Sequence, residues 1–203
     1  MPKKPQARTV RLDHELEGAA HHVRYEIAMF LYAASRLSSY CASPPSPSAE
    51  AQNSTLESFL LHFRNVRAFL CPSLQPLHSD DVIASDFLRQ PIVADIGDPV
   101  KLDTDHKRLD RMLSHLSYER AKYIAAGDLG WNIRQLTTIV LEELSKFVDA
   151  IPSNMTEWFP SQAFVGECRT NMAEWFARND NALDYSWSIE SAESRDQVPE
   201  YGA

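Results

Sequence analysis

The chain has 203 residues, of which 44% are hydrophobic and 24% are charged, and its formal net charge is −8. This length and composition suit one soluble globular domain. The acidic balance excludes a broad basic surface for nucleic acid, and no apolar run approaches the roughly 18 residues of a membrane span. The three cysteines form no Cys-x-x-Cys pair, which disfavours a zinc or redox motif. We therefore expect a reduced, cytoplasmic protein with no membrane partner.

The charge distribution separates two tails from a central domain. Residues 1–11 carry four basic side chains and no acidic ones, whereas residues 179–203 carry six acidic side chains and one arginine. We expect a single helical-bundle domain over residues 12–178. The acidic tail is either solvated or it covers a basic groove or contacts a partner. Period-two spacing predicts that one extended piece of this tail docks an apolar face on the body, through Tyr185, Trp187 and Ile189.

The first two predicted helices have clear apolar stripes. The first runs from a cap at Asp13 to about Cys41, and the second runs from a cap at Ser54 or Thr55 to about Leu70. Between them, residues 42–54 predict a Pro/Ser-rich surface loop. The first stripe alternates steps of four and three and consists of Leu16, Ala20, Val23, Ile27, Phe30, Ala34, Leu37 and Cys41. The second stripe consists of Leu56, Phe59, Leu60, Phe63, Val66 and Leu70.

The middle of the chain is less regular. Residues 71–101 predict an irregular excursion, with a short helix from Asp80 or Asp81 to about Phe87 and turns over 91–99. A third long helix is expected over about 103–126, since Gly127 and Gly130 follow it. Its apolar side consists of Leu102, Leu109, Leu113, Leu116 and Tyr123.

Two further helices complete an all-α fold. The fourth is expected over about 132–151, with Ile133, Leu136, Val140, Leu144, Phe147 and Ile151 on one face. The fifth begins near Pro160 or Ser161 and reaches about Arg178, with Phe164, Cys168, Met172 and Trp175 directed inward. Trp158 and Phe159 precede it and either pack in the core or, if exposed, contact a partner. The sequence thus predicts a bundle of four to five main helices.

Polar side chains with catalytic potential lie on the third predicted helix. Seven residues along an α-helix turn it by about 700°, so Arg108 and His115 lie within about 20° of each other. Arg111 lies one turn before His115, and Tyr118 lies nearly one turn after it. Imidazole transfers protons near neutral pH, and arginine holds phosphate groups. The strip therefore contains the groups that a metal-independent ribonuclease requires, although the same residues would also suit a solvated, salt-bridged helix face.

An Arg followed by six residues and a His on a helix of an α-bundle resembles the HEPN superfamily, the higher eukaryotes and prokaryotes nucleotide-binding domains. Arg108 and His115 fit the long form of that pattern, and Arg64–Asn65 matches the family's usual first two residues. The resemblance implies an RNA-cleaving site formed across a homodimer, with His115 transferring protons, Arg108 contacting phosphate and Arg111 supporting it. It implies no metal and no cofactor.

A second polar set lies on the second predicted helix. His62 is one position off the apolar stripe, and Arg64 and Asn65 point toward the polar side. One interpretation makes His62 a boundary residue with one hydrogen bond. The alternative is that His62 and Arg64 face the strip around His115 and line a polar cleft with it.

Two other functions stay open for a helical chain of this kind. One is a non-enzymatic protein that binds a partner or oligomerises. The other is a metal-binding bundle, for which His21, His22 and Glu26, Asp103 with His106, and Glu142–Glu143 are the available ligands. The metal hypothesis has little support, because no Glu-x-x-His pair occurs on two different helices.

Overall fold

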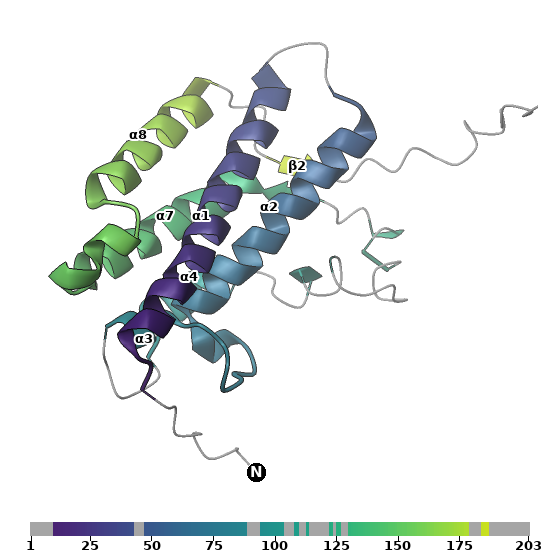
Figure 1. Ribbon diagram of the computed structural model, residues 1–203. Coiled ribbons are helices and arrows are strands. Elements are labelled where there is room, and N and C mark those ends of the chain that lie inside the picture. The colour runs from purple at the N-terminus through teal and green to yellow at the C-terminus, as the bar shows by residue number, and fades with distance from the viewer. Residues whose placement is uncertain are drawn as a thin grey trace, which may run out of the picture.

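The computed structural model describes residues 10–42, 47–88, 94–103, 108–109, 113, 122–123, 125–126, 130–178 and 184–186. This part of the chain is all-α apart from two three-residue strands, which confirms the predicted fold class. Its long helices are α1 (Asp13–Ala42), α2 (Ala49–Leu70), α7 (Ile133–Ala150) and α8 (Gln162–Arg178). Figure 1 shows α1 beside α2, with α7 crossing behind them, and α8 at the left edge of the view, where it contacts both α7 and α1.

The apolar stripe of α1 forms one side of the core, as its spacing predicts. Each of the predicted positions whose side chain is described is buried, namely Leu16, Ala20, Val23, Ile27, Phe30, Ala34 and Leu37. The expected cap at Asp13 is wrong, because Asp13 is already the first helical residue. Glu15 closes this end instead, since its Oε2 accepts a hydrogen bond of 2.8 Å from the Leu12 amide.

The second helix is longer than the sequence predicts. All six residues of its expected stripe are buried, but α2 begins at Ala49 rather than at Ser54 or Thr55. Ser48 is its N-cap, because the Ser48 Oγ accepts a hydrogen bond of 3.3 Å from the Ala51 amide. The Pro/Ser composition of residues 42–54 suggested a loop throughout, although the residues after Ser48 are good helix formers.

Replacing Ser48 with alanine is expected to lower the free energy of unfolding by about 1 kcal/mol, because the Ala51 amide loses its acceptor. Ser54→Ala is the matched control. Ser54 is exposed inside the helix, so its replacement should be neutral or stabilising by about 0.3 kcal/mol through helix propensity. Urea unfolding followed by circular dichroism measures both variants. Equal losses in the two would contradict the assignment of Ser48 as the cap.

The irregular region contains two single-turn helices. The predicted helix from Asp80 or Asp81 begins later, as α3 (Ala84–Phe87), because the Asp81 carboxylate accepts a hydrogen bond of 2.6 Å from the His78 amide and forms a turn there. A 3₁₀ turn, η1 (Pro72–Leu74), follows α2 directly. The second short helix is α4 (Pro99–Leu102), which Asp98 caps by accepting a hydrogen bond of 2.9 Å from Val100 N. Leu102 therefore belongs to α4 and not to the third long helix.

The segment before α4 is tied to the end of α2. The amides of Ile96 and Gly97 both donate to the Leu70 carbonyl, at 2.9 and 3.1 Å. A Cβ atom at Gly97 would lie 2.7 Å from Leu102 Cδ1 and 2.9 Å from Cys71 Sγ. Glycine is required here because the backbone approaches the core more closely than any side chain allows.

The fourth predicted helix is α7, and its predicted face is buried throughout. Asn132 caps it, since Asn132 Oδ1 accepts a hydrogen bond of 2.8 Å from the Gln135 amide. Phe147 on this helix packs at right angles against Phe69 and Phe159, each with ring centroids 5.0 Å apart. Phe87 of α3 joins the same aromatic cluster. Phe159 therefore packs in the core, which decides between its two predicted placements.

The fifth predicted helix is confirmed, but one of its inward residues is wrong. After the 3₁₀ segment η2 (Ser153–Trp158), α8 directs Val165 into the core at 1% exposure, whereas Phe164 is 46% exposed. Both residues fit an apolar spacing with Cys168 and Met172, which are half-buried. The docking of α8 on α7 selects Val165 and leaves Phe164 on the surface.

A short stretch of the C-terminal segment is extended, as its period-two spacing predicts. Strand β2 (Asp184–Ser186) pairs antiparallel with β1 (Gly130–Asn132), and Trp131 lies opposite Tyr185 in the register. This pairing joins a segment from the acidic tail to the start of α7. The predicted contacts of Trp187 and Ile189 lie outside the described residues.

Only parts of the third predicted helix are described. Residues 108–109, 113, 122–123 and 125 are helical, and Leu109 is buried. Leu116, the excursion at 89–93 and most of both tails lie outside the described residues. In the ranges that the structure does describe, no helix has the length and the apolar character needed to cross a membrane.

Candidate functional site

Arg108 is the one residue of the predicted catalytic strip that the structure describes. Its side chain is buried, and its Nη2 donates a hydrogen bond of 2.6 Å to the Gly130 carbonyl. Its guanidinium carbon lies 4.1 Å from the centre of the Trp131 ring. Arg108 therefore fastens its helix to β1 through a hydrogen bond and a cation–π contact. Arg111, His115 and Tyr118 lie outside the described residues.

His62 and Asn65 of α2 converge on Glu26 of α1. His62 is buried, and its Nδ1 donates to Glu26 Oε2 at 2.7 Å. Asn65 Nδ2 donates to the same oxygen at 2.9 Å. The edge of Tyr25 lies against the His62 ring, with centroids 5.8 Å apart. We call these residues the Glu26 cluster.

The bond from the buried His62 to Glu26 fits the interpretation of His62 as a residue beside the apolar stripe with a hydrogen-bond partner. A carboxylate that binds Nδ1 fixes the orientation and the tautomer of the imidazole, so that Nε2 is the nitrogen available for proton exchange. Arg64 is half-buried on the same helix. The proposed cleft between His62, Arg64 and His115 stays a prediction, because His115 is outside the described residues.

The metal hypothesis finds no support among the described side chains. Glu26, which the sequence groups with His21 and His22, is directed to α2 instead. No group of three or more His, Cys, Asp or Glu side chains in the described ranges could hold a metal ion.

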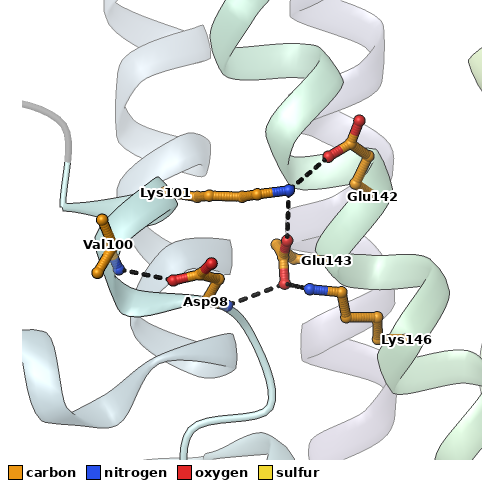
Figure 2. Close-up of polar contacts among 6 residues, drawn as sticks. All are labelled: Asp98, Val100, Lys101, Glu142, Glu143 and Lys146. Carbon is orange, nitrogen blue, oxygen red and sulfur yellow. Dashed lines mark hydrogen bonds and ion pairs between the residues drawn. The ribbon is translucent and has the colours of Figure 1, made fainter.

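A second polar cluster, which we call the Glu143 cluster, joins α4 to α7 (Figure 2). The Glu143 carboxylate is fully buried, and its Oε2 accepts hydrogen bonds from Lys146 and, at 2.9 Å, from the Asp98 amide. Lys101 Nζ lies 3.8 Å from Glu143 Oε1 and donates to Glu142 at 3.1 Å. The hydrogen bond that Lys101 donates to Glu142 raises the pKa of Lys101 above its usual value. Glu142 and Glu143, which the sequence offers as one possible pair of metal ligands, are thus both bound to lysines.

The Glu143 cluster holds the irregular region against the bundle. The sequence contains an indication of this cluster: Glu143 lies on the same buried face of α7 as Val140, Leu144 and Phe147. A carboxylate on such a face needs partners from elsewhere in the chain. Cys71 lies close to this cluster, and burial, with smaller effects of Asp95 and Glu143, raises the pKa of its thiol to about 12. Cys71 therefore remains a protonated thiol at neutral pH, unsuited to act as a nucleophile.

The surface of α1 that faces away from the core has an unusual composition. Eight consecutive positions at steps of three and four are all exposed: His14, Gly18, His21, Tyr25, Ala28, Tyr32, Ser35 and Ser39. We call them the outer face of α1. The positions of the outer face are expected, because a helix that buries one row of residues exposes another row on its opposite side. The composition is not expected, because the outer face has no Asp, Glu, Lys or Arg, while 24% of the residues in the chain are charged. Tyr25 and Tyr32 are 57% and 59% exposed.

A groove runs beside the outer face, between α1 and the start of α8. Its volume is about 350 Å³. Its lining consists of Arg24, Ile27, Ala28 and Leu31 from α1 and Pro160, Ser161 and Phe164 from the other side. Figure 1 shows α8 next to α1 along this edge of the bundle. The mostly apolar groove and the uncharged outer face share Ala28 and are therefore continuous on the surface of the bundle.

Comparisons of the chain with protein-family models, with curated proteins and with solved structures found no match.

Proposed function

We propose that this protein is a non-enzymatic helical interaction module, and that the outer face of α1 binds an α-helix of another polypeptide chain. The observation that carries the proposal is the outer face itself, a row of exposed positions that runs from His14 to Ser39 without one carboxylate, guanidinium or ammonium group. A solvated helix face normally carries such groups. Protein interfaces are depleted in charged side chains at their centre and enriched in tyrosine, and the outer face has both properties.

The geometry of the outer face suits a helical partner. Steps of three and four place its side chains in a narrow seam along the helix, which is the arrangement that packs against a second helix. Tyr25 and Tyr32 offer large rigid rings with a polar end, the side chains that dominate binding at interfaces. Phe164 extends the apolar surface on the α8 side.

The described polar clusters support a structural role for the charged residues of the interior. The Glu26 cluster joins α1 to α2, the Glu143 cluster joins α4 to α7, and Arg108 joins its helix to β1. Each of these groups is used in holding elements together. RNA cleavage by His115, with Arg108 and Arg111 at the phosphate and Tyr118 beside them, stays a prediction of the sequence.

Photo-cross-linking in the cells that make the protein tests the proposed function. A photoreactive phenylalanine analogue replaces Tyr32, and its matched control replaces Val100, which is 85% exposed on α4. We expect discrete cross-linked products from position 32 and none from position 100. The same products from both positions, or none from either, would refute the outer face as a binding surface. Mass spectrometry then identifies the chain that is captured.

A further inference from the structure

We propose that the occupant of the outer face is a second copy of this chain, with two α1 helices packed antiparallel about a two-fold axis between Tyr25 and Ala28. This inference rests on the proposed function, since it names the partner of the same surface. Three properties of α1 carry it: the register of the outer face, the sizes of its side chains and the charges that flank it.

The spacing of the outer face is the same in both directions along α1, so the face can be placed in register against a reversed copy of itself. If Tyr25 of one copy lies opposite Ala28 of the other, every pair of facing positions has residue numbers that add to 53. His14 then faces Ser39, Gly18 faces Ser35, and His21 faces Tyr32, so all eight positions meet a position of the same face. A two-fold interface has this property, because the same patch must serve both subunits.

The sizes of the facing side chains allow close packing. At the centre, each exposed tyrosine ring at position 25 meets a methyl group at position 28 of the other copy. Farther out, His21 and Tyr32 are two large side chains that lie beside each other, and beyond them Gly18 and Ser35 face each other and let the backbones approach. A large side chain opposite a small one is the pattern by which two helices interdigitate.

The charges beside the outer face favour the antiparallel orientation. The first turns of α1 carry Asp13, Glu15 and Glu17, whereas the later turns carry Arg36. Glu15 and Arg36 are both exposed, and each directly follows a position of the outer face, so they lie on the same flank of the helix. Antiparallel packing brings Glu15 of each copy beside Arg36 of the other, twice by symmetry. Parallel packing would instead place like charges together.

Charge reversal tests the register with the whole protein. Sedimentation equilibrium should show a dimer for the wild type, and Glu15→Arg or Arg36→Glu should each raise the dimer dissociation constant by about tenfold, since each change reverses two pairs. The double variant should return it to near the wild-type value. Glu57→Arg on α2 and Arg169→Glu on α8 make the same charge changes at exposed positions elsewhere and should leave it unchanged.

Engineered disulfides provide a second measurement of the orientation. Gly18→Cys combined with Ser35→Cys should give cross-linked dimers on oxidation, because the two positions face each other across the interface. Ser35→Cys alone should give no more disulfide-linked dimer than the wild type does, since the two copies of position 35 would lie about 25 Å apart along the helices. Cross-linking by Ser35→Cys alone would overturn the antiparallel register.

The two proposals fail in different ways. A wild-type chain that stays monomeric at all concentrations, while photo-cross-linking at Tyr32 captures a different protein, overturns self-association and leaves the interaction face standing. The absence of any cross-link from Tyr32 overturns both. A dimer that is insensitive to the Glu15 and Arg36 changes overturns the proposed packing.

Discussion

Replacing Phe147 with alanine is expected to lower the free energy of unfolding by about 4 kcal/mol. Phe147 has no exposed surface, and its ring packs at right angles against Phe69 of α2 and Phe159, which follows η2. Its ring also lies 6.3 Å from that of Phe87 in α3. Removing the ring leaves a cavity where four separate segments meet, and the backbone of a helix cannot move inward enough to fill it.

Urea denaturation at one low protein concentration measures this loss. Since a domain of this size has a total stability of about 5–15 kcal/mol, the variant should unfold at clearly lower urea. Phe164→Ala removes the same ring from a surface position and should cost less than about 1 kcal/mol. If the two variants lost equal stability, the aromatic cluster would not be the centre of the core.

The second large effect is expected from Glu143→Ala, which should cost about 3 kcal/mol. This change removes the acceptor of the Asp98 amide and the buried partner of Lys146. Glu143→Gln should cost about half as much, because an amide oxygen still accepts from the Asp98 amide. Glu142→Ala is the matched control, and it should cost less than about 1 kcal/mol since Glu142 is partly exposed.

Amide hydrogen exchange separates a local effect from a global one. With Glu143 replaced by alanine, the Asp98 amide should exchange faster than amides of the α1–α2 pair, because the irregular region is released before the bundle unfolds. In the Glu142 variant the Asp98 amide should exchange as in the wild type. Equal acceleration of all amides by Glu143→Ala would contradict a role in tethering that region.

The positions of the core-facing residues follow from the sequence. The stripes of α1, α2 and α7 are confirmed, because the 3.6-residue repeat is a local property of each helix. Helix ends are less well predicted. The structure begins α2 at Ala49, since the bond to the Ser48 side chain outweighs the loop character that its prolines suggest.

The choice between two equally spaced residues depends on packing. Phe164 and Val165 both fit a stripe with Cys168 and Met172, and they differ by only one position on the helix. The contact between α7 and α8 buries Val165 and turns Phe164 toward α1. A stripe on α8 alone carries no information about which neighbour covers it.

Residue chemistry was visible in the sequence, whereas the partners of each polar group were not. His62 and Glu143 could be placed on or beside buried faces, but Glu26 lies 36 residues from His62, and Asp98 lies 45 residues from Glu143. For the outer face of α1, too, the sequence provides the residues while the tertiary structure decides whether they are exposed. Its residues are readable from the spacing, but their exposure depends on α2, α7 and α8 all packing on other sides of the helix. Helical periodicity acts within a few turns of one chain segment, while burial and hydrogen bonding depend on segments that meet only after the bundle has formed.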